Sequence, residues 1–266
     1  MKIALILPAA GSSTRYNSTD ALLGSSRSKL DEDLGGRPVL QRTVELFHTR
    51  PEIDTIIVAG PHNREQFADF SLRHQDKLTL LGAMLVQGGA NERYETVQAA
   101  LAHVPEHCTH IAVHDAARPG TPADLIDRVI DAASRHAAVI PAIPVGDTIK
   151  RVATEPIEDP GADPLGNILG GSTAPLHEVE QTLERAGLMQ VQTPQVFERG
   201  LLLRAYAQEN LASTDDAGLV ERLGERVVVV GGDDRNLKIT RPGDTEVLRA
   251  ILGYSRAQQR ATHKKF

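Results

Sequence analysis

Two basic residues bracket a loop of small residues near the amino terminus. Gly11 is followed by two serines and a threonine, and Arg15 and Lys29 lie on either side of the longer loop that continues from them. Small residues let backbone N–H groups approach a ligand closely, and cations stabilise phosphate charge. The stretch predicts a polyphosphate site. On these residues alone, an ordinary strand-to-loop turn with two solvated cations is the alternative.

The loop matches neither of two well-known phosphate-binding motifs. The P-loop pattern GxxxxGK[ST] is absent, and Gly11 is followed by Ser12, Ser13 and Thr14 rather than by the spacing GxGxxG. Since GxGxxG marks dinucleotide-binding folds, its absence argues against a dehydrogenase that transfers hydride.

Stretches that resemble strands alternate with stretches that resemble helices five times. Apolar runs predict strands at 3–7, 53–59, 83–86, 110–114 and 138–143. Helical spacing of apolar residues predicts helices at 38–47, 63–73, 92–104 and 122–136. This alternation is typical of an α/β fold with a mostly parallel sheet and helices on both faces. In such folds ligands bind beyond the carboxyl ends of the strands, where the loops 9–29, 88–96 and 115–118 begin.

The amino-acid composition of the chain changes after residue 146. The stretch 146–171 is rich in Gly, Pro, Asp and Glu, and 179–183 alternates like a strand. Residues 147–190 hold too few apolar side chains to form their own core. We therefore expect one domain over 1–266 from which 147–190 protrudes as a β-arm. Such an arm gains its burial from another subunit, which predicts a homodimer.

The chain then returns to the main domain. We expect helices at 201–208 and at 214–223, with Thr214 as the N-cap of the second. A last strand at 227–230 precedes a C-terminal helix from 242 to about 252.

Composition restricts the partners and the compartment. A net charge of −6 argues against nucleic acid as the main partner, although anionic substrates remain compatible with cations gathered in one cleft. Cys108 is the only cysteine, so no intrachain disulfide can form. No apolar run reaches the roughly 20 residues that span a bilayer, and Met1 and Lys2 lead directly into the first strand. We expect no membrane partner and a cytoplasmic location.

Several stretches agree in order and spacing with one family. They are LPAAGSSTR at 7–15, SKL at 28–30, RYETV at 93–97, VHDAARP at 113–119, DTIK at 147–150, TPQVF at 193–197, TDDAGLVERLG at 214–224 and NLKITRPGD at 236–244. Together they resemble the 2-C-methyl-D-erythritol 4-phosphate cytidylyltransferases, which are nucleotidyltransferases with a Rossmann-like fold. HDAARP, TPQ and NLKIT in this order are specific, whereas any one of them alone is a weak signal.

The resemblance implies a reaction and its partners. CTP and 2-C-methyl-D-erythritol 4-phosphate would give 4-CDP-2-C-methyl-D-erythritol and pyrophosphate, a step of the non-mevalonate isoprenoid pathway. It implies Mg²⁺ as cofactor, held mainly by the CTP phosphates and water, since Mg²⁺ prefers phosphate oxygens and retains waters. We expect no protein metal site, with Asp115 as the best candidate for a nearby carboxylate. The family's β-arm is exchanged across a dimer.

The resemblance also implies roles for individual residues. The catalytic residues would be Arg15, Lys29 and Lys238. The nucleotide would be bound by Ala9, Ala10, Gly11, Gly89, Thr96, Asp115 and Arg118. The methylerythritol phosphate would be bound by Asp115, Thr148, Arg185, Thr193, Thr214 and Lys238, with Arg185 acting on the partner subunit's substrate.

Structural alternatives compete with several of these roles. Asp115 and Arg118 can form an ion pair that only shapes a turn, and Arg185 can be a surface charge. Lys238 lies between two apolar neighbours on an extended segment, which suits a cleft lysine or a solvated edge lysine equally. Thr214 can be merely a helix cap.

The chain also departs from the family's usual pattern. Ser13 stands where a second glycine is common, part of 17–27 is extra, and the GG…R spacing at 88–93 is one residue longer. Two other functions therefore stay open. One is a cytidylyltransferase for ribitol 5-phosphate or another polyol phosphate, and the other is a nucleotide-binding protein without catalysis.

Overall fold

The computed structural model describes residues 1–11, 16, 28–157 and 175–254. It contains two compact units, Met1–Ile143 with Val191–Phe266 and Pro144–Gln190. The elements in chain order are β1 (Ile3–Pro8), α2 (Val39–Glu45), β2 (Ile53–Gly60), α3 (Arg64–Leu80), β3 (Ala83–Gln87), α4 (Arg93–Leu101), β4 (His110–Val113), α5 (Ala123–Ala133), β5 (Ala138–Pro144), β6 (Lys150–Val152), β7 (Val179–Thr182), β8 (Met189–Val191), β9 (Gln195–Glu198), α7 (Arg199–Tyr206), α8 (Ala217–Arg222), β10 (Val228–Gly231) and α9 (Pro242–Ile251).

The sheet of the larger unit is mostly parallel, as predicted. Its strand order is β10-β5-β9-β4-β1-β2-β3. β1 runs parallel to β2 and to β4, and β3 runs parallel to β2. β9 is the exception, because it pairs antiparallel with both β4 and β5. The carboxyl ends of β1, β2, β3 and β4 therefore meet at one edge of the sheet.

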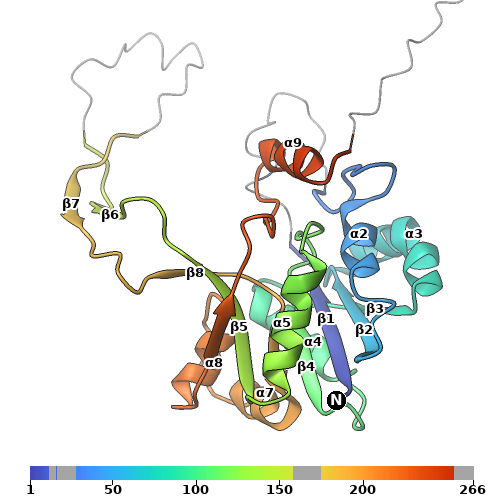
Figure 1. Ribbon diagram of the computed structural model, residues 1–266. Helices are drawn as coiled ribbons and strands as arrows, with labels where there is room; N and C mark the ends of the chain where they lie inside the picture. Colours follow the sequence, from blue (N-terminus) through green and yellow to red (C-terminus); the bar gives the residue numbers. More distant parts are fainter. Residues whose placement is uncertain (12–15, 17–27, 158–174, 255–266) are drawn as a thin grey trace, which may run out of the picture. The chain divides into compact units, whose positions relative to one another are not determined.

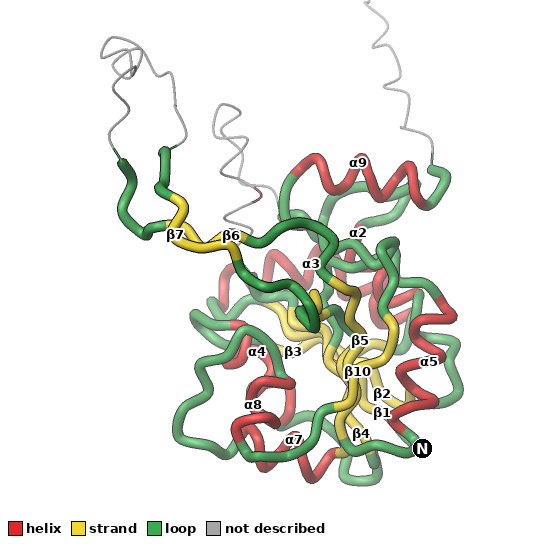
Figure 2. The backbone as a smooth tube through the Cα atoms, turned by 60° about the vertical axis from the view of Figure 1, so that its left-hand side comes forward, coloured by secondary structure: helices red, strands yellow, loops and turns green. Residues whose placement is uncertain are grey.

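β1 lies inside the sheet, between β4 and β2, and its two faces belong to two different cores. Its side chains alternate, so Ile3, Leu5 and Leu7 enter one core while Ala4 and Ile6 enter the other, all fully buried. Residues of α2, α3, α5 and α9 pack in the first core, and residues of α4, α7 and α8 pack in the second. Figures 1 and 2 show α5 on one side of the strands and α4, α7 and α8 on the other. The prediction of helices on both faces is confirmed.

Two predicted helix boundaries were wrong. The helix expected at 63–73 continues as α3 to Leu80, because Phe70, His74 and Leu78 recur every four residues and are all buried. The exposed Leu72 and Leu80 obscured this spacing in the sequence. The helix expected to begin after Thr214 begins instead at Ala217.

The smaller unit contains a two-stranded antiparallel ribbon. β6 pairs with β7, so that Lys150 lies opposite Thr182. None of the described residues between 144 and 190 is buried. The ribbon therefore has no core of its own.

None of the helices in the described part of the chain is long and apolar enough to cross a membrane.

Candidate active site

A cavity of about 450 Å³ lies at the carboxyl ends of β1 and β4, beside the start of α4. Its lining contains eight of the predicted site residues, namely Ala9, Ala10, Gly11, Lys29, Gly89, Thr96, Asp115 and Lys238. A hollow of about 550 Å³ between α3 and β3 has no charged side chain in its lining. Because an anionic ligand needs cations, the cavity beside Asp115 is the candidate active site.

Lys29 is held against the segment that carries Lys238. Its Nζ donates a hydrogen bond to the carbonyl oxygen of Ile239 at 2.9 Å. The Ile239 N–H in turn donates to the carbonyl of Ala117 at 2.9 Å. Two lysines from distant parts of the sequence are thus brought to one cavity. Arg15, the third predicted catalytic cation, lies outside the described residues.

Asp115 is surrounded by cations. Its Oδ2 lies 3.0 Å from Lys238 Nζ and 3.0 Å from Arg118 Nε, and its Oδ1 lies 3.6 Å from Arg93 Nε. Burial by itself would raise the pKa of Asp115, but Lys238, Arg93 and Arg118 together hold this pKa well below its usual range. Asp115 is therefore a carboxylate at neutral pH, and it fixes the positions of three cations. Lys238 is a cleft lysine, which decides between the two alternatives for this residue.

Arg93 connects this cluster to a second carboxylate. Its guanidinium lies 2.8 Å from Oδ2 of Asp216, which is fully buried, and the Tyr206 hydroxyl donates to Oδ1 of Asp216 at 2.5 Å. Burial alone would lower the pKa of Arg93, but Asp216 and Asp115 raise it above its usual value. Arg93, Asp216 and Tyr206 were not predicted as site residues. The sequence did hold one indication for Arg93, which is the first residue of α4. The helix dipole disfavours a cation at that position unless a carboxylate is paired with it.

Arg118 and Thr193 lie behind Asp115 rather than in the cavity lining. The Arg118 guanidinium also donates to the carbonyl of Asn236 at 2.6 Å, which favours the alternative in which the Asp115–Arg118 pair shapes the turn after β4. The Thr193 hydroxyl accepts the Asp115 N–H at 3.0 Å and shares a hydrogen bond with Nδ1 of His114 at 3.0 Å.

Asn236 joins the segments behind the cavity. Its amide group donates to the carbonyl of Thr193 at 2.8 Å and accepts from the Thr121 hydroxyl at 2.7 Å. Asn236 is almost fully buried, and it lies two residues before Lys238. These hydrogen bonds fix the backbone from which Lys238 enters the cavity. The sequence showed Asn236 only as the first residue of NLKIT.

The loop before α4 closes around Thr96. The Gly89 N–H donates to the Thr96 hydroxyl at 3.3 Å, and this hydroxyl donates to the carbonyl of Glu92 at 3.4 Å. A Cβ on Gly89 would lie 2.2 Å from the Cβ of Glu95, so only glycine fits there. The sequence placed Thr96 in the site but gave no reason for the glycine.

The remaining predicted residues are placed as follows. The Ala9 N–H donates to the carbonyl of Ala59 at 2.8 Å, so Ala9 can offer its carbonyl and methyl group to a ligand but not its N–H. Thr214 is exposed and is not in the cavity lining. Thr148 and Arg185 lie in the smaller unit, where Thr148 is exposed and the Arg185 guanidinium donates to the carbonyl of Gly146.

Known proteins match the chain over most of its length. The family model of 2-C-methyl-D-erythritol 4-phosphate cytidylyltransferase (IspD) matches residues 3–159 and 171–254. The protein of that name from Frankia casuarinae is 38% identical over 252 residues, covering 94% of this chain and 81% of the relative. The one from Solibacter usitatus is 35% identical over 255 residues, covering 95% of this chain and 96% of the relative.

Solved structures agree with the sequence relatives. The crystal structure of 2-C-methyl-D-erythritol 4-phosphate cytidylyltransferase from Thermus thermophilus is 28% identical, with a TM-score of 0.66 and coverage of 94% of this chain and 98% of the other. A crystal structure of 4-diphosphocytidyl-2C-methyl-D-erythritol synthase is 31% identical, with a TM-score of 0.68 and coverage of 94% and 98%.

Proposed function

Since the chain belongs to the 2-C-methyl-D-erythritol 4-phosphate cytidylyltransferase family, it transfers the cytidylyl group of CTP to 2-C-methyl-D-erythritol 4-phosphate, and we propose that the cavity beside Asp115 is where this transfer takes place. The observation that carries the proposal is the convergence of Lys29 and Lys238 on one cavity. Arg93 also lines the cavity, Arg118 lies behind it, and both share Asp115 with Lys238. The cavity thus attracts a triphosphate and a second phosphate together.

The reaction is a displacement at the α-phosphorus of CTP. A phosphate oxygen of methylerythritol phosphate forms the new P–O bond, and the bond to the β-phosphate breaks, so that pyrophosphate leaves with the bonding electron pair. Positioning and charge stabilisation accomplish most of this chemistry. Lys29 and Lys238 neutralise the charge that develops around the α-phosphorus. Each preorganised donor contributes roughly 3–4 kcal/mol to such a transition state.

We assign base recognition to the loop before α4. Thr96 lines the cavity, and its hydroxyl is held in place by Gly89 and Glu92. A hydroxyl in a fixed position can hydrogen-bond to the edge of cytosine. Ala10 and Gly11 also line the cavity, and we assign their backbone to the phosphates.

We place Mg²⁺ on the CTP phosphates rather than on Asp115. Both oxygens of Asp115 already face cations, Oδ2 facing Lys238 and Arg118 and Oδ1 facing Arg93. This carboxylate therefore does not suit a magnesium ligand. A magnesium ion carried by the triphosphate would offset its charge and retain waters.

We propose that the protein is a homodimer joined through the residues 144–190. The support is the exposure of this unit, none of whose described residues is buried. Its exposed apolar side chains are Val152, Ile157, Leu176, Val179, Leu188 and Met189, with exposures between 39% and 53%. A second copy would cover them and would bring Arg185 to its partner's substrate.

We also place the protein in the cytoplasm. A chain with one cysteine cannot use intrachain disulfides, so its fold does not depend on an oxidising compartment.

A paired assay tests the function. Purified protein is mixed with CTP and Mg²⁺ and either methylerythritol phosphate or ribitol 5-phosphate, and pyrophosphate release is followed. We expect faster release with methylerythritol phosphate. Faster turnover of ribitol 5-phosphate would refute the substrate assignment. Calorimetric binding of CTP, with no pyrophosphate released from it in the presence of either polyol phosphate, would refute catalysis.

A further inference from the structure

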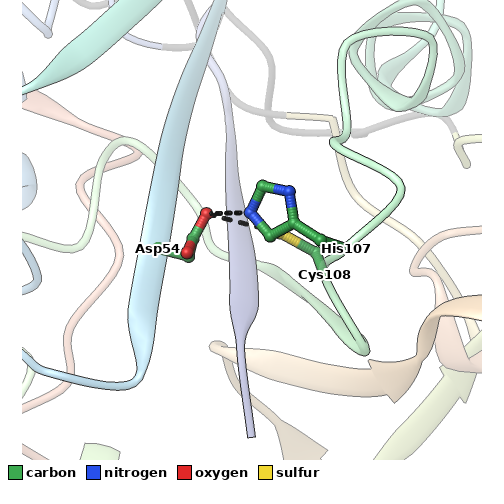
Figure 3. A group of neighbouring side chains, drawn as sticks. All are labelled: Asp54, His107 and Cys108. Carbon is green, nitrogen blue, oxygen red and sulfur yellow. Dashed lines mark hydrogen bonds and ion pairs between the residues drawn. The ribbon is translucent and has the colours of Figure 1, made fainter.

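A second cluster of reactive side chains lies at the opposite edge of the sheet. Asp54 is the second residue of β2, and His107 and Cys108 lie three and two residues before the first residue of β4. Because β1 runs between these two strands, the three side chains gather across its amino-terminal end (Figure 3). The cavity beside Asp115 is at the carboxyl ends of the same strands. The cluster is thus separate from the transferase site.

The three donor atoms have nearly the spacing of a metal site. His107 Nε2 lies 2.6 Å from Asp54 Oδ2, Cys108 Sγ lies 3.8 Å from the same oxygen, and all three atoms lie within 4.8 Å of one another. Tetrahedral zinc with bonds of about 2.0–2.3 Å places its ligand atoms roughly 3.3–3.7 Å apart. The imidazole therefore has to move away from the carboxylate by roughly 1 Å. Its side chain is 55% exposed, so there is space for this movement.

We propose that Asp54, His107 and Cys108 bind a divalent transition metal of the zinc type, with water as the fourth ligand. An imidazole nitrogen, a sulfur and a carboxylate oxygen form a borderline-soft set of ligands that selects zinc over magnesium or calcium. Asp54 and His107 open the site to solvent, whereas Cys108 is buried beneath them. A metal can thus enter from solvent and reach the thiol.

The ammonium of Lys2 and the proton of the Cys108 thiol compete with the metal. Lys2 Nζ lies 3.1 Å from Asp54 Oδ1, and this lysine is 60% exposed, so its ammonium can turn into water. The thiol must also lose its proton before its sulfur can bind the metal. It carries this proton at neutral pH, because burial first and the charge of Asp54 second raise the pKa of Cys108. Metal binding therefore releases a proton and displaces Lys2.

Cobalt titration of the untagged full-length protein tests the proposal. Co²⁺ takes the place of Zn²⁺, and sulfur-to-cobalt charge transfer gives an ultraviolet absorption band. Cys108 is the only cysteine, so such a band identifies its sulfur as a ligand. We expect one equivalent of Co²⁺ to produce the band and Zn²⁺ to abolish it. No band at millimolar Co²⁺ would overturn the proposal.

Four variants then identify the ligands. Cys108→Ser should remove the band, while circular dichroism checks that the fold is intact. His107→Gln and Asp54→Asn should each weaken Co²⁺ binding at least about tenfold. Loss of a residue that only supports a metal ligand already lowers metal affinity about tenfold, and loss of a ligand should lower it at least as much. His136→Gln, at an exposed histidine just after α5, is the matched control and should change nothing.

Lys2→Gln should change Co²⁺ affinity in the opposite direction. Removing the competing ammonium should tighten Co²⁺ binding, which loss of a merely structural ion pair would not do. Unchanged binding in both His107→Gln and Asp54→Asn would overturn the three-ligand site. In every variant of this cluster we expect pyrophosphate release to match the wild-type protein, because the cluster lies away from the cavity.

Discussion

Lowering the pH from 7 to 5 should destabilise the protein through one histidine. His114 is fully buried between β4 and the loops behind the cavity. Burial lowers the pKa of His114 to about 3, and the neighbouring carboxylate of Asp115 offsets this only partly. A histidine in an unfolded chain has a pKa of about 6.5. The two states therefore differ in proton uptake between these values.

The sign of the effect follows from which state binds the proton. Below pH 6.5 the unfolded chain protonates His114, whereas the folded protein keeps it neutral down to a pH of about 3. The stability that His114 contributes is complete above pH 6.5 and is lost as the pH falls towards 3. The loss is about 1.4 kcal/mol per pH unit, which amounts to about 2 kcal/mol at pH 5.

Urea unfolding of the wild type and of His114→Gln measures this loss. Both proteins are unfolded with urea at pH 7 and at pH 5 at one protein concentration, because the stability of the proposed dimer would depend on concentration. The difference between the two free energies of unfolding should be about 2 kcal/mol smaller at pH 5 than at pH 7. The other histidines contribute equally to the free energies of unfolding of both proteins, so their contributions cancel in the difference. His136→Gln, at an exposed position, should show no such change with pH.

A difference that is equal at the two pH values would refute the reasoning. It would mean that His114 is protonated within the folded protein. Its ring nitrogens would then both donate hydrogen bonds, including the bond between Nδ1 and the Thr193 hydroxyl.

Three further predictions concern the site. Lys29→Ala should lower pyrophosphate release about 10²–10³-fold while circular dichroism shows that the protein is still folded, and near-normal activity would remove Lys29 from the mechanism. Mixing equal amounts of Arg185→Ala and Lys29→Ala subunits should restore about a quarter of wild-type activity, because half of the dimers are mixed and each of these has one intact site. No recovery after verified subunit exchange would exclude a shared site. Asp216→Asn should lower the free energy of unfolding by roughly 2–3 kcal/mol, less than the usual loss for a buried pair because the Arg93 side chain is 26% exposed. A loss below about 0.5 kcal/mol in urea would show that this pair does not stabilise the fold.

Much of the fold was predictable because its signals are local. The run from Ile3 to Leu7 is apolar at every position, which predicts a strand that is buried on both faces, and β1 is such a strand. The alternation of strands and helices then indicated the α/β class. The antiparallel direction of β9 was not predictable, because the residues of a short strand carry no information about its neighbours. The end of α3 was missed because its buried face is narrow and two leucines, Leu72 and Leu80, lie outside that face.

The sequence by itself determined the fold class, the family and the cationic residue types of the site, because periodicity and motif order are written along the chain. Only the tertiary structure decided that Lys238 faces Asp115 and that Arg93 joins Asp115 to the buried Asp216. The physical reason is that a charge acquires its role from the groups that surround it after folding. Those groups come from segments far apart in the sequence, and their distances are set by the packing of the sheet and its two helical layers.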